Sequence, residues 1–117
     1  MKDFWKKKGW LIMVNSIKKS QVEKIIQYVK ENDAFDKVVI FGDAITDRVN
    51  KNTYIDVAVR TTHEDDATNE EVLFDVLSAI DSATDGRFNF VVMNDPDLTS
   101  NTLHEIERGE VVYERKC

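Results

Sequence analysis

The strongest constraint on the fold comes from two short segments, residues 38–41 and 54–59. Residues 38–41 form a continuous run of β-branched and aromatic side chains that ends at Gly42, which predicts a buried strand. Residues 54–59 are also rich in strand-forming side chains, with one charge at Asp56. We expect the second segment to lie beside the first in a sheet that helices cover.

Two helices are predicted from the spacing of apolar side chains. Ser20 and Glu23 form a capping box, and the pattern behind them predicts an amphipathic helix through about residue 31. A second helix is predicted from Asn69, and Asp85 followed by Gly86 is expected to end it. The apolar positions are Val22, Ile25, Ile26 and Val29 in the first helix and Leu73, Val76, Leu77, Ile80 and Ala83 in the second.

The last part of the chain predicts a further strand, a third helix and a short closing strand. Residues 88–93 are expected to form the first of these. Asp95 as N-cap, with Pro96 at the first helical position, predicts a helix that closes near Gly109. A strand at residues 111–113 follows. This order of elements predicts an α+β fold with a small mixed sheet covered by helices.

Length, charge and cysteine content narrow the class of protein. The sequence has no linker or repeat, which predicts a single domain over residues 1–117. A net charge of −6 makes duplex nucleic acid an unexpected ligand. The lysines at 6–8 are expected to form a solvated turn before a short strand at 10–14, a run too short to span a membrane. With Cys117 as the one cysteine, we expect a cytoplasmic protein without a membrane segment.

The main candidates for a functional site lie where the first two predicted strands meet. Gly42 and Asp43 follow the first strand, ten residues intervene, and Tyr54 and Asp56 then open the second strand. This arrangement resembles the G-S-x10-D-x-D signature of minimal nucleotidyltransferases, which are small bacterial members of the polymerase-beta superfamily.

The resemblance extends in order and spacing over roughly residues 20–114. The strand at 88–93 stands where the family has its third carboxylate strand, and residues 106–113 look like the family's closing helix, glycine and strand. The resemblance implies a nucleotidyltransferase fold and, for active members, transfer with two divalent cations such as Mg²⁺. Carboxylates two apart on a strand face the same side, so a D-x-D pair converges on the metals.

Only part of the family's pattern is present in this chain. Gly42 matches the glycine, and Asp56 matches the second acid. Asp43 stands in place of the serine, Tyr54 in place of the first acid, and Asn89 is the best match to the third acid. Because a phenol and an amide are poor ligands for magnesium, Asp56 is the one metal ligand left, and we expect it to bind weakly if at all.

Asp43 is also expected to act against a nucleotide. Its carboxylate would point at the place where a triphosphate oxygen should rest. For unit charges about 4 Å apart at an effective dielectric near 20, the repulsion is on the order of 4 kcal/mol. The resemblance therefore implies a degenerate, vestigial nucleotide pocket, formed by Gly42, Asp43, Tyr54, Asp56 and Asn89.

Three functions remain open at this point. The first is a noncatalytic binding or regulatory module of a two-component pair without a metal cofactor. The resemblance implies a helical HEPN-type partner, as in toxin–antitoxin systems in which the nucleotidyltransferase-like protein is the antitoxin. The second is an active nucleotidyltransferase that uses Asp43 and Asp56 with Mg²⁺ in an altered site. The third is a pocket that holds a nucleotide without reacting it.

Three other polar groups are weaker candidates for chemistry. Residues 63–66 could bind a cation, but a run of acids between a strand and a helix is more typical of a solvated loop. Asp95 and Asp97 look like a D-x-D pair, yet the proline between them favours capping. His104 lacks the spacing of a zinc-binding helix and is expected at the surface or half-buried.

Two structural expectations follow. The segments 38–41, 55–59 and 88–92 should be adjacent strands of one sheet, with Gly42 and Asp56 near each other at one end. The buried core should include Ile25, Val39, Val57, Leu77 and Val91.

Overall fold

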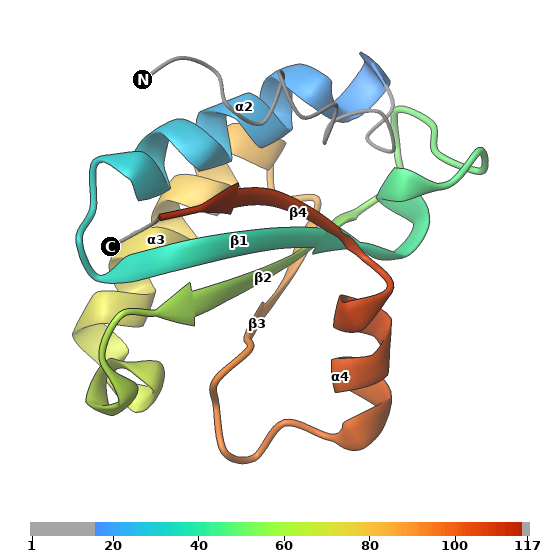
Figure 1. The fold of residues 1–117 in the computed structure, drawn as a ribbon. Helices are drawn as coiled ribbons and strands as arrows, with labels where there is room; N and C mark the ends of the chain where they lie inside the picture. The colour runs from blue at the N-terminus through green and yellow to red at the C-terminus, as the bar shows by residue number, and fades with distance from the viewer. Residues whose placement is uncertain (1–15, 116–117) are drawn as a thin grey trace.

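The computed structural model describes residues 16–115, and its elements follow the predicted order (Figure 1). The helices are α2 (Ser16–Lys30), α3 (Glu70–Thr84) and α4 (Ser100–Glu107), with short 3₁₀ helices η2 (Gly42–Ile45) and η3 (Glu64–Thr68). The strands are β1 (Phe35–Phe41), β2 (Ile55–Thr61), β3 (Phe88–Val92) and β4 (Glu110–Glu114). The strand predicted at residues 10–14, the lysine run before it and Cys117 lie outside the described residues.

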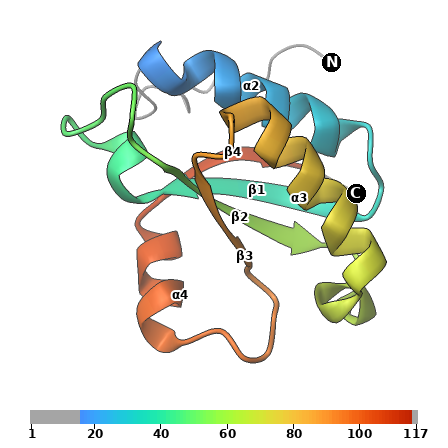
Figure 2. The same cartoon turned by 180° about the vertical axis from the view of Figure 1, so that it is seen from behind.

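The four strands form one mixed sheet in the order β3-β2-β1-β4. β1 is antiparallel to both β2 and β4, whereas β2 and β3 are parallel. Helices α2 and α3 lie side by side over one face of the sheet, and α4 lies over the other (Figures 1 and 2). The predicted fold class, a small mixed sheet covered by helices, is confirmed.

The strand register aligns the ends that matter for function. Phe41, the last residue of β1, lies opposite Asp56 at the start of β2. Asp56 in turn lies opposite Asn89 at the start of β3. The three predicted strands are therefore adjacent, and Gly42 and Asp56 meet at one end of the sheet as expected.

Each face of the sheet has its own buried side chains. The larger cluster lies under α2 and α3 and includes Ile25 and Val57, both predicted to be buried. The smaller cluster lies under α4 and includes Val39, also as predicted. Leu77 and Val91 are only partly buried. Val91 lies on the α4 side, where one short helix covers less of the sheet, and Leu77 lies beside the fully buried positions of α3.

The first helix begins earlier than the capping box predicted. It starts at Ser16, so Ser20 lies inside the helix and the prediction that Ser20 caps it was wrong. Lys18 in the added turn is only 1% exposed, and its Nζ donates a hydrogen bond to the main-chain oxygen of Lys51 at 3.1 Å. A long aliphatic stem can pack like an apolar residue while its amine finds a distant carbonyl. The apolar pattern, which starts at Val22, carries no sign of this anchor.

The predicted start of α3 at Asn69 and its predicted end at Asp85 and Gly86 are confirmed, whereas the predicted start of α4 is not. The Asn69 side chain caps α3 by accepting from the main-chain N–H groups of Glu71 and Val72. By contrast, Asp95 accepts from the main-chain N–H of Asp97 in a turn, and α4 begins at Ser100 with Thr99 as its cap. The predicted cap at Asp95 was therefore wrong, because an Asp-Pro pair is also a turn-forming sequence.

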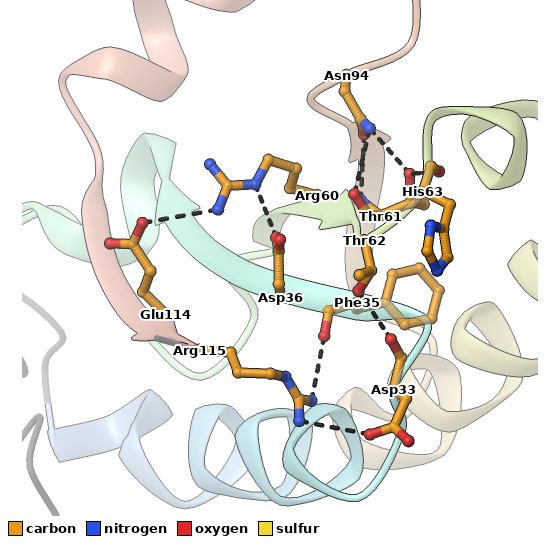
Figure 3. Close-up of polar contacts among 10 residues, drawn as sticks. All are labelled: Asp33, Phe35, Asp36, Arg60, Thr61, Thr62, His63, Asn94, Glu114 and Arg115. Atoms are coloured by element: carbon orange, nitrogen blue, oxygen red, sulfur yellow. Dashed lines mark hydrogen bonds and ion pairs between the residues drawn. The ribbon is translucent and has the colours of Figure 1, made fainter. Parts of the chain in front are cut away.

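Arg115, just after β4, binds the chain where α2 ends and β1 begins. Its Nη2 donates hydrogen bonds to the main-chain oxygens of Val29, Asn32 and Phe35 at 3.1, 3.2 and 3.2 Å. Its Nη1 lies 3.5 Å from the Asp33 carboxylate (Figure 3). The oxygens of Val29 and Asn32 also accept main-chain N–H groups, so this guanidinium adds a second, charged donor and ties the α2–β1 turn to the end of β4.

A second arginine links the strands next to this contact. Arg60 on β2 donates from Nε to Asp36 on β1 at 2.7 Å, and its Nη2 lies 3.6 Å from Glu114 on β4 (Figure 3). The guanidinium thus links three strands at the end of the sheet opposite Gly42.

None of the helices within residues 16–115 has the length and apolarity needed to cross a bilayer.

Arg115→Met should lower the free energy of unfolding by about 1–3 kcal/mol, because it removes three part-buried hydrogen bonds from a charged donor while keeping the apolar stem. Chemical denaturation would measure the change. The control is Arg108→Met, whose side chain is 73% exposed, and it should change stability by about 0.5 kcal/mol or less. Equal effects of the two substitutions would contradict this role of Arg115.

Candidate functional site

The predicted site residues come together in one pocket at the end of the sheet. A pocket of about 390 Å³ is lined by Gly42, Asp43, Thr53, Tyr54, Asp56, Asn89 and Glu105. Five of these residues are the ones that the sequence singled out. They come from η2, from the start of β2 and its preceding loop, and from β3, and the strand register described above places them side by side.

Gly42 allows β1 to turn directly into η2 beside Asp56. Its φ is +74°, a conformation that side chains with a Cβ rarely adopt. A Cβ at this position would also overlap the Asp56 carboxylate. Glycine is therefore favoured here both by the backbone conformation and by the close approach of the Asp56 side chain.

Asp56 is half-buried at the centre of the site. Its Oδ1 accepts a hydrogen bond from the Asn89 side-chain amide at 2.7 Å. Burial raises the pKa of Asp56 above its ordinary value, the Asn89 hydrogen bond acts in the opposite direction, and the nearby charges of Asp43 and Glu105 raise the pKa further. The carboxylate therefore sits in an electronegative pocket with a neutral donor as its direct partner.

Asp43 lies in the first turn of η2 and has a cationic partner. Its Oδ1 lies 2.8 Å from Nη2 of Arg48, and the two side chains are 58% and 74% exposed, respectively. An ion pair this exposed contributes little to stability. It does place a guanidinium next to the carboxylate at the position where the family has serine, and the sequence reasoning did not foresee this pair.

Tyr54 and Glu105 complete the pocket from two directions. Tyr54 comes just before β2 and is 50% exposed, so its phenol lies at the mouth rather than in the interior. Glu105 comes from α4 and was not predicted to belong to the site. In the sequence, Glu105 is distinguished only by its place next to Ile106, the buried residue of α4. Its place in the pocket depends on how α4 packs beneath the strand ends, which the local sequence does not indicate.

The donor set does not fit a two-metal centre. Within residues 16–115, no three His, Cys, Asp or Glu side chains are arranged to hold a metal ion. Asn89 presents its amide donor to Asp56, and Tyr54 supplies a phenol where a carboxylate is needed. The weaker candidates add nothing, because Glu64 and Asp65 are exposed on η3 and His104 is exposed on α4.

A four-stranded mixed sheet with a glycine turn and an aspartate at adjoining strand ends defines the class as a nucleotidyltransferase fold. The family model "Polymerase beta, Nucleotidyltransferase" matches residues 23–117. The chain therefore belongs to the polymerase beta nucleotidyltransferase family. A search of curated proteins found no match.

Solved structures show the same fold in toxin–antitoxin complexes. A toxin–antitoxin complex with AMP-PNP aligns with a TM-score of 0.60 and 13% identity over 82% of this chain and 73% of that one. The MntA-HepT toxin–antitoxin aligns with a TM-score of 0.58 and 17% identity, over 80% and 70%. A tri-AMPylated Shewanella oneidensis HEPN toxin in complex with MNT antitoxin gives 0.54 and 13%, over 80% and 72%. At these identities the likeness establishes the fold alone.

Gly42→Ala should destabilise the protein by about 1–3 kcal/mol, because it combines an unfavourable φ with overlap on Asp56. Gly86→Ala is the matched control, since Gly86 also has a positive φ of +78° but a Cβ there would lie 3.4 Å from its nearest neighbour. Denaturation should show a larger loss for Gly42→Ala. When Asp56 is also changed to Ala, the extra loss of stability caused by Gly42→Ala over Gly86→Ala should disappear. If that extra loss stayed the same, it would contradict the close approach of Gly42 and the Asp56 carboxylate.

Asp56→Asn should raise the melting temperature at pH 7 more than at pH 3.5. The folded pKa of Asp56 lies above its ordinary value of 3.8, so the folded state favours the protonated carboxyl. The stabilising effect of protonation is complete below the unfolded pKa and is lost as the pH rises through the folded pKa. Asparagine removes the charge at every pH. A melting-temperature shift of the same size at both pH values would contradict the raised pKa.

Proposed function

We propose that this protein is a noncatalytic binding or regulatory module with a degenerate nucleotidyltransferase site, acting in a two-component pair. The observation that carries the proposal is the hydrogen bond from the Asn89 amide to Asp56. In an active site of this family the third acid and Asp56 would share a cation, and here the residue at that position donates a hydrogen bond to Asp56 instead of supplying an anionic ligand.

The other departures from the family pattern support the same proposal. Tyr54 leaves the first acid position without an anionic oxygen. Asp43 puts a negative charge beside Gly42, where the backbone would otherwise be free to approach phosphates. Arg48 pairs with Asp43 in an exposed contact, which offsets part of that charge and leaves the carboxylate in the pocket.

The side chains of this pocket do not match the set of metal ligands used by active members of the family. Divalent cations in active members stabilise charge on the attacking and leaving oxygens. This chain offers the carboxylates of Asp43, Asp56 and Glu105 from three separate elements, and they do not form a metal-binding group. We therefore assign this chain no step of nucleotidyl transfer.

We propose a helical HEPN-type protein as the partner. The structural neighbours are described as toxin–antitoxin complexes, one of them with a HEPN toxin and another with AMP-PNP. A domain that kept the fold but lost the catalytic residues would still present the surfaces of that fold. Binding to the partner, with or without a nucleotide in the pocket, is then the function left to it.

The alternative is an active nucleotidyltransferase with an altered metal site that uses Asp43 and Asp56. One observation favours it: Glu105 adds a third carboxylate to the same pocket, and it came from an element outside the family motif. A cation there would relieve the repulsion that raises the pKa of Asp56. The experiment below separates the two functions.

We expect no transfer of AMP from labelled ATP to the protein, to small acceptors or to a coexpressed helical HEPN-type protein from a neighbouring reading frame. Such a HEPN-type protein should nevertheless copurify with the native chain. Asp43→Ser combined with Tyr54→Asp and Asn89→Asp restores the family pattern, and this triple variant should gain magnesium-dependent ATP binding that the native chain lacks.

Two outcomes would contradict the proposal. Robust label transfer by the native protein, lost on Asp56→Ala, would establish the altered-site enzyme instead. A HEPN-type protein from a neighbouring reading frame that does not copurify, although both proteins are soluble and folded, would contradict the two-component pair. Asp47→Ser is a matched control for the triple variant, since it changes an exposed acid just outside the pocket and should leave ATP binding unchanged.

A further inference from the structure

The outer side of α3 carries an exposed aromatic ring among acidic side chains. Phe74 is 68% exposed, the largest exposure among the large apolar side chains of the described residues. It lines a shallow depression of about 440 Å³ together with Glu70, Glu71 and Asp75. We refer to these four residues as the α3 face.

The α3 face lies in a stretch of sequence that contains many acidic residues and no basic ones. Residues 61–86 contain no Lys or Arg. The stretch holds eight acidic residues: Glu64, Asp65, Asp66, Glu70, Glu71, Asp75, Asp81 and Asp85. Within residues 16–115, none of these eight carboxylates lies in an ion pair with Lys or Arg, whereas Asp33, Asp36, Asp43, Glu105 and Glu114 do. These eight carboxylates are therefore not paired with a cation in the described part of the chain.

Phe74 is not needed for the packing of the helix. The buried positions of α3 are Val76, Ile80, Ala83 and Thr84, which face the sheet and α2. An aromatic side chain that the core does not use leaves apolar surface in water, and burying such a ring in a partner is a common source of binding energy. The ring and the acids are separate features that point to the same kind of ligand.

The α3 face is also remote from the pocket around Asp56. The pocket lies where β2 begins, whereas η3 and the start of α3 follow the end of β2 at Thr61. In Figure 2, α3 lies in front of the sheet, with α4 on the far side of the strands. Binding at this face therefore does not depend on whether the pocket is catalytic.

We propose that the α3 face binds a protein segment in which Lys or Arg residues flank an apolar side chain. The uncompensated carboxylates select a cationic ligand and speed its association, while the Phe74 ring selects an apolar anchor. Phosphate backbones and anionic membranes carry the same sign as this face and are repelled by it. A partner protein with a basic, amphipathic segment satisfies both requirements.

The test measures binding of a labelled peptide, KKWKKLLKK, to the full chain by fluorescence anisotropy. Phe74→Ser should weaken binding about tenfold or more. The pair Glu71→Gln with Asp75→Asn should weaken it and reduce its dependence on salt. The matched controls on α4 are Leu103→Ser, a 39% exposed apolar residue, and Glu107→Gln, and they should change the affinity less than about twofold. The acidic peptide EEWEELLEE should not bind.

Several results would overturn the proposal. Unchanged affinity in Phe74→Ser, or an equal loss in the α4 controls, would mean that the peptide senses only the net charge of the protein. Tighter peptide binding after Lys6, Lys7 and Lys8 are all changed to Gln would mean that the chain's own lysines compete for the face. Self-association of the native chain that is lost in Phe74→Ser would assign the face to a second copy. Circular dichroism on each variant confirms that α3 is intact.

Discussion

The close approach of Gly42 and Asp56 is the constraint on which the rest of the molecule depends. β1 turns into η2 at a glycine with positive φ, and the absence of a Cβ there leaves room for the Asp56 carboxylate. The strand register places Asp56 opposite Phe41 and Asn89. The glycine and the register together therefore determine the shape of the pocket.

In this chain the geometry is combined with side chains that differ from the G-S-x10-D-x-D pattern. The backbone of the site is that of the polymerase beta nucleotidyltransferase family. Its side chains hold Asp56 with an amide donor and pair Asp43 with an arginine. Backbone geometry depends on glycine and strand register, whereas metal binding depends on a few carboxylates, so the second can be lost without the first.

The sequence predicted those parts of the structure that depend on local pattern. The run at residues 38–41, the glycine after it and the apolar spacing that starts after Asn69 are local signals, and they located the sheet, the pocket and α3. Features that depend on distant partners were missed. Lys18 finds a carbonyl of Lys51, and Glu105 reaches the pocket only because α4 packs under the strand ends. Neither residue differs in type or spacing from an ordinary surface charge, so pattern alone could not identify it.

The contact made by Arg115 has a consequence for the order in which the chain can fold. Its guanidinium binds carbonyls at the junction of α2 and β1, and β4 beside it pairs with β1. The contacts of α2 and β1 are thus completed by β4 and Arg115, which leave the ribosome after every other described element. An emerging chain can form the β1–β2 hairpin early, but α2 and the open edge of β1 must wait for the last strand. Until then, the unpaired edge of β1 can pair with other chains, and we expect a chaperone to bind the emerging chain at this edge.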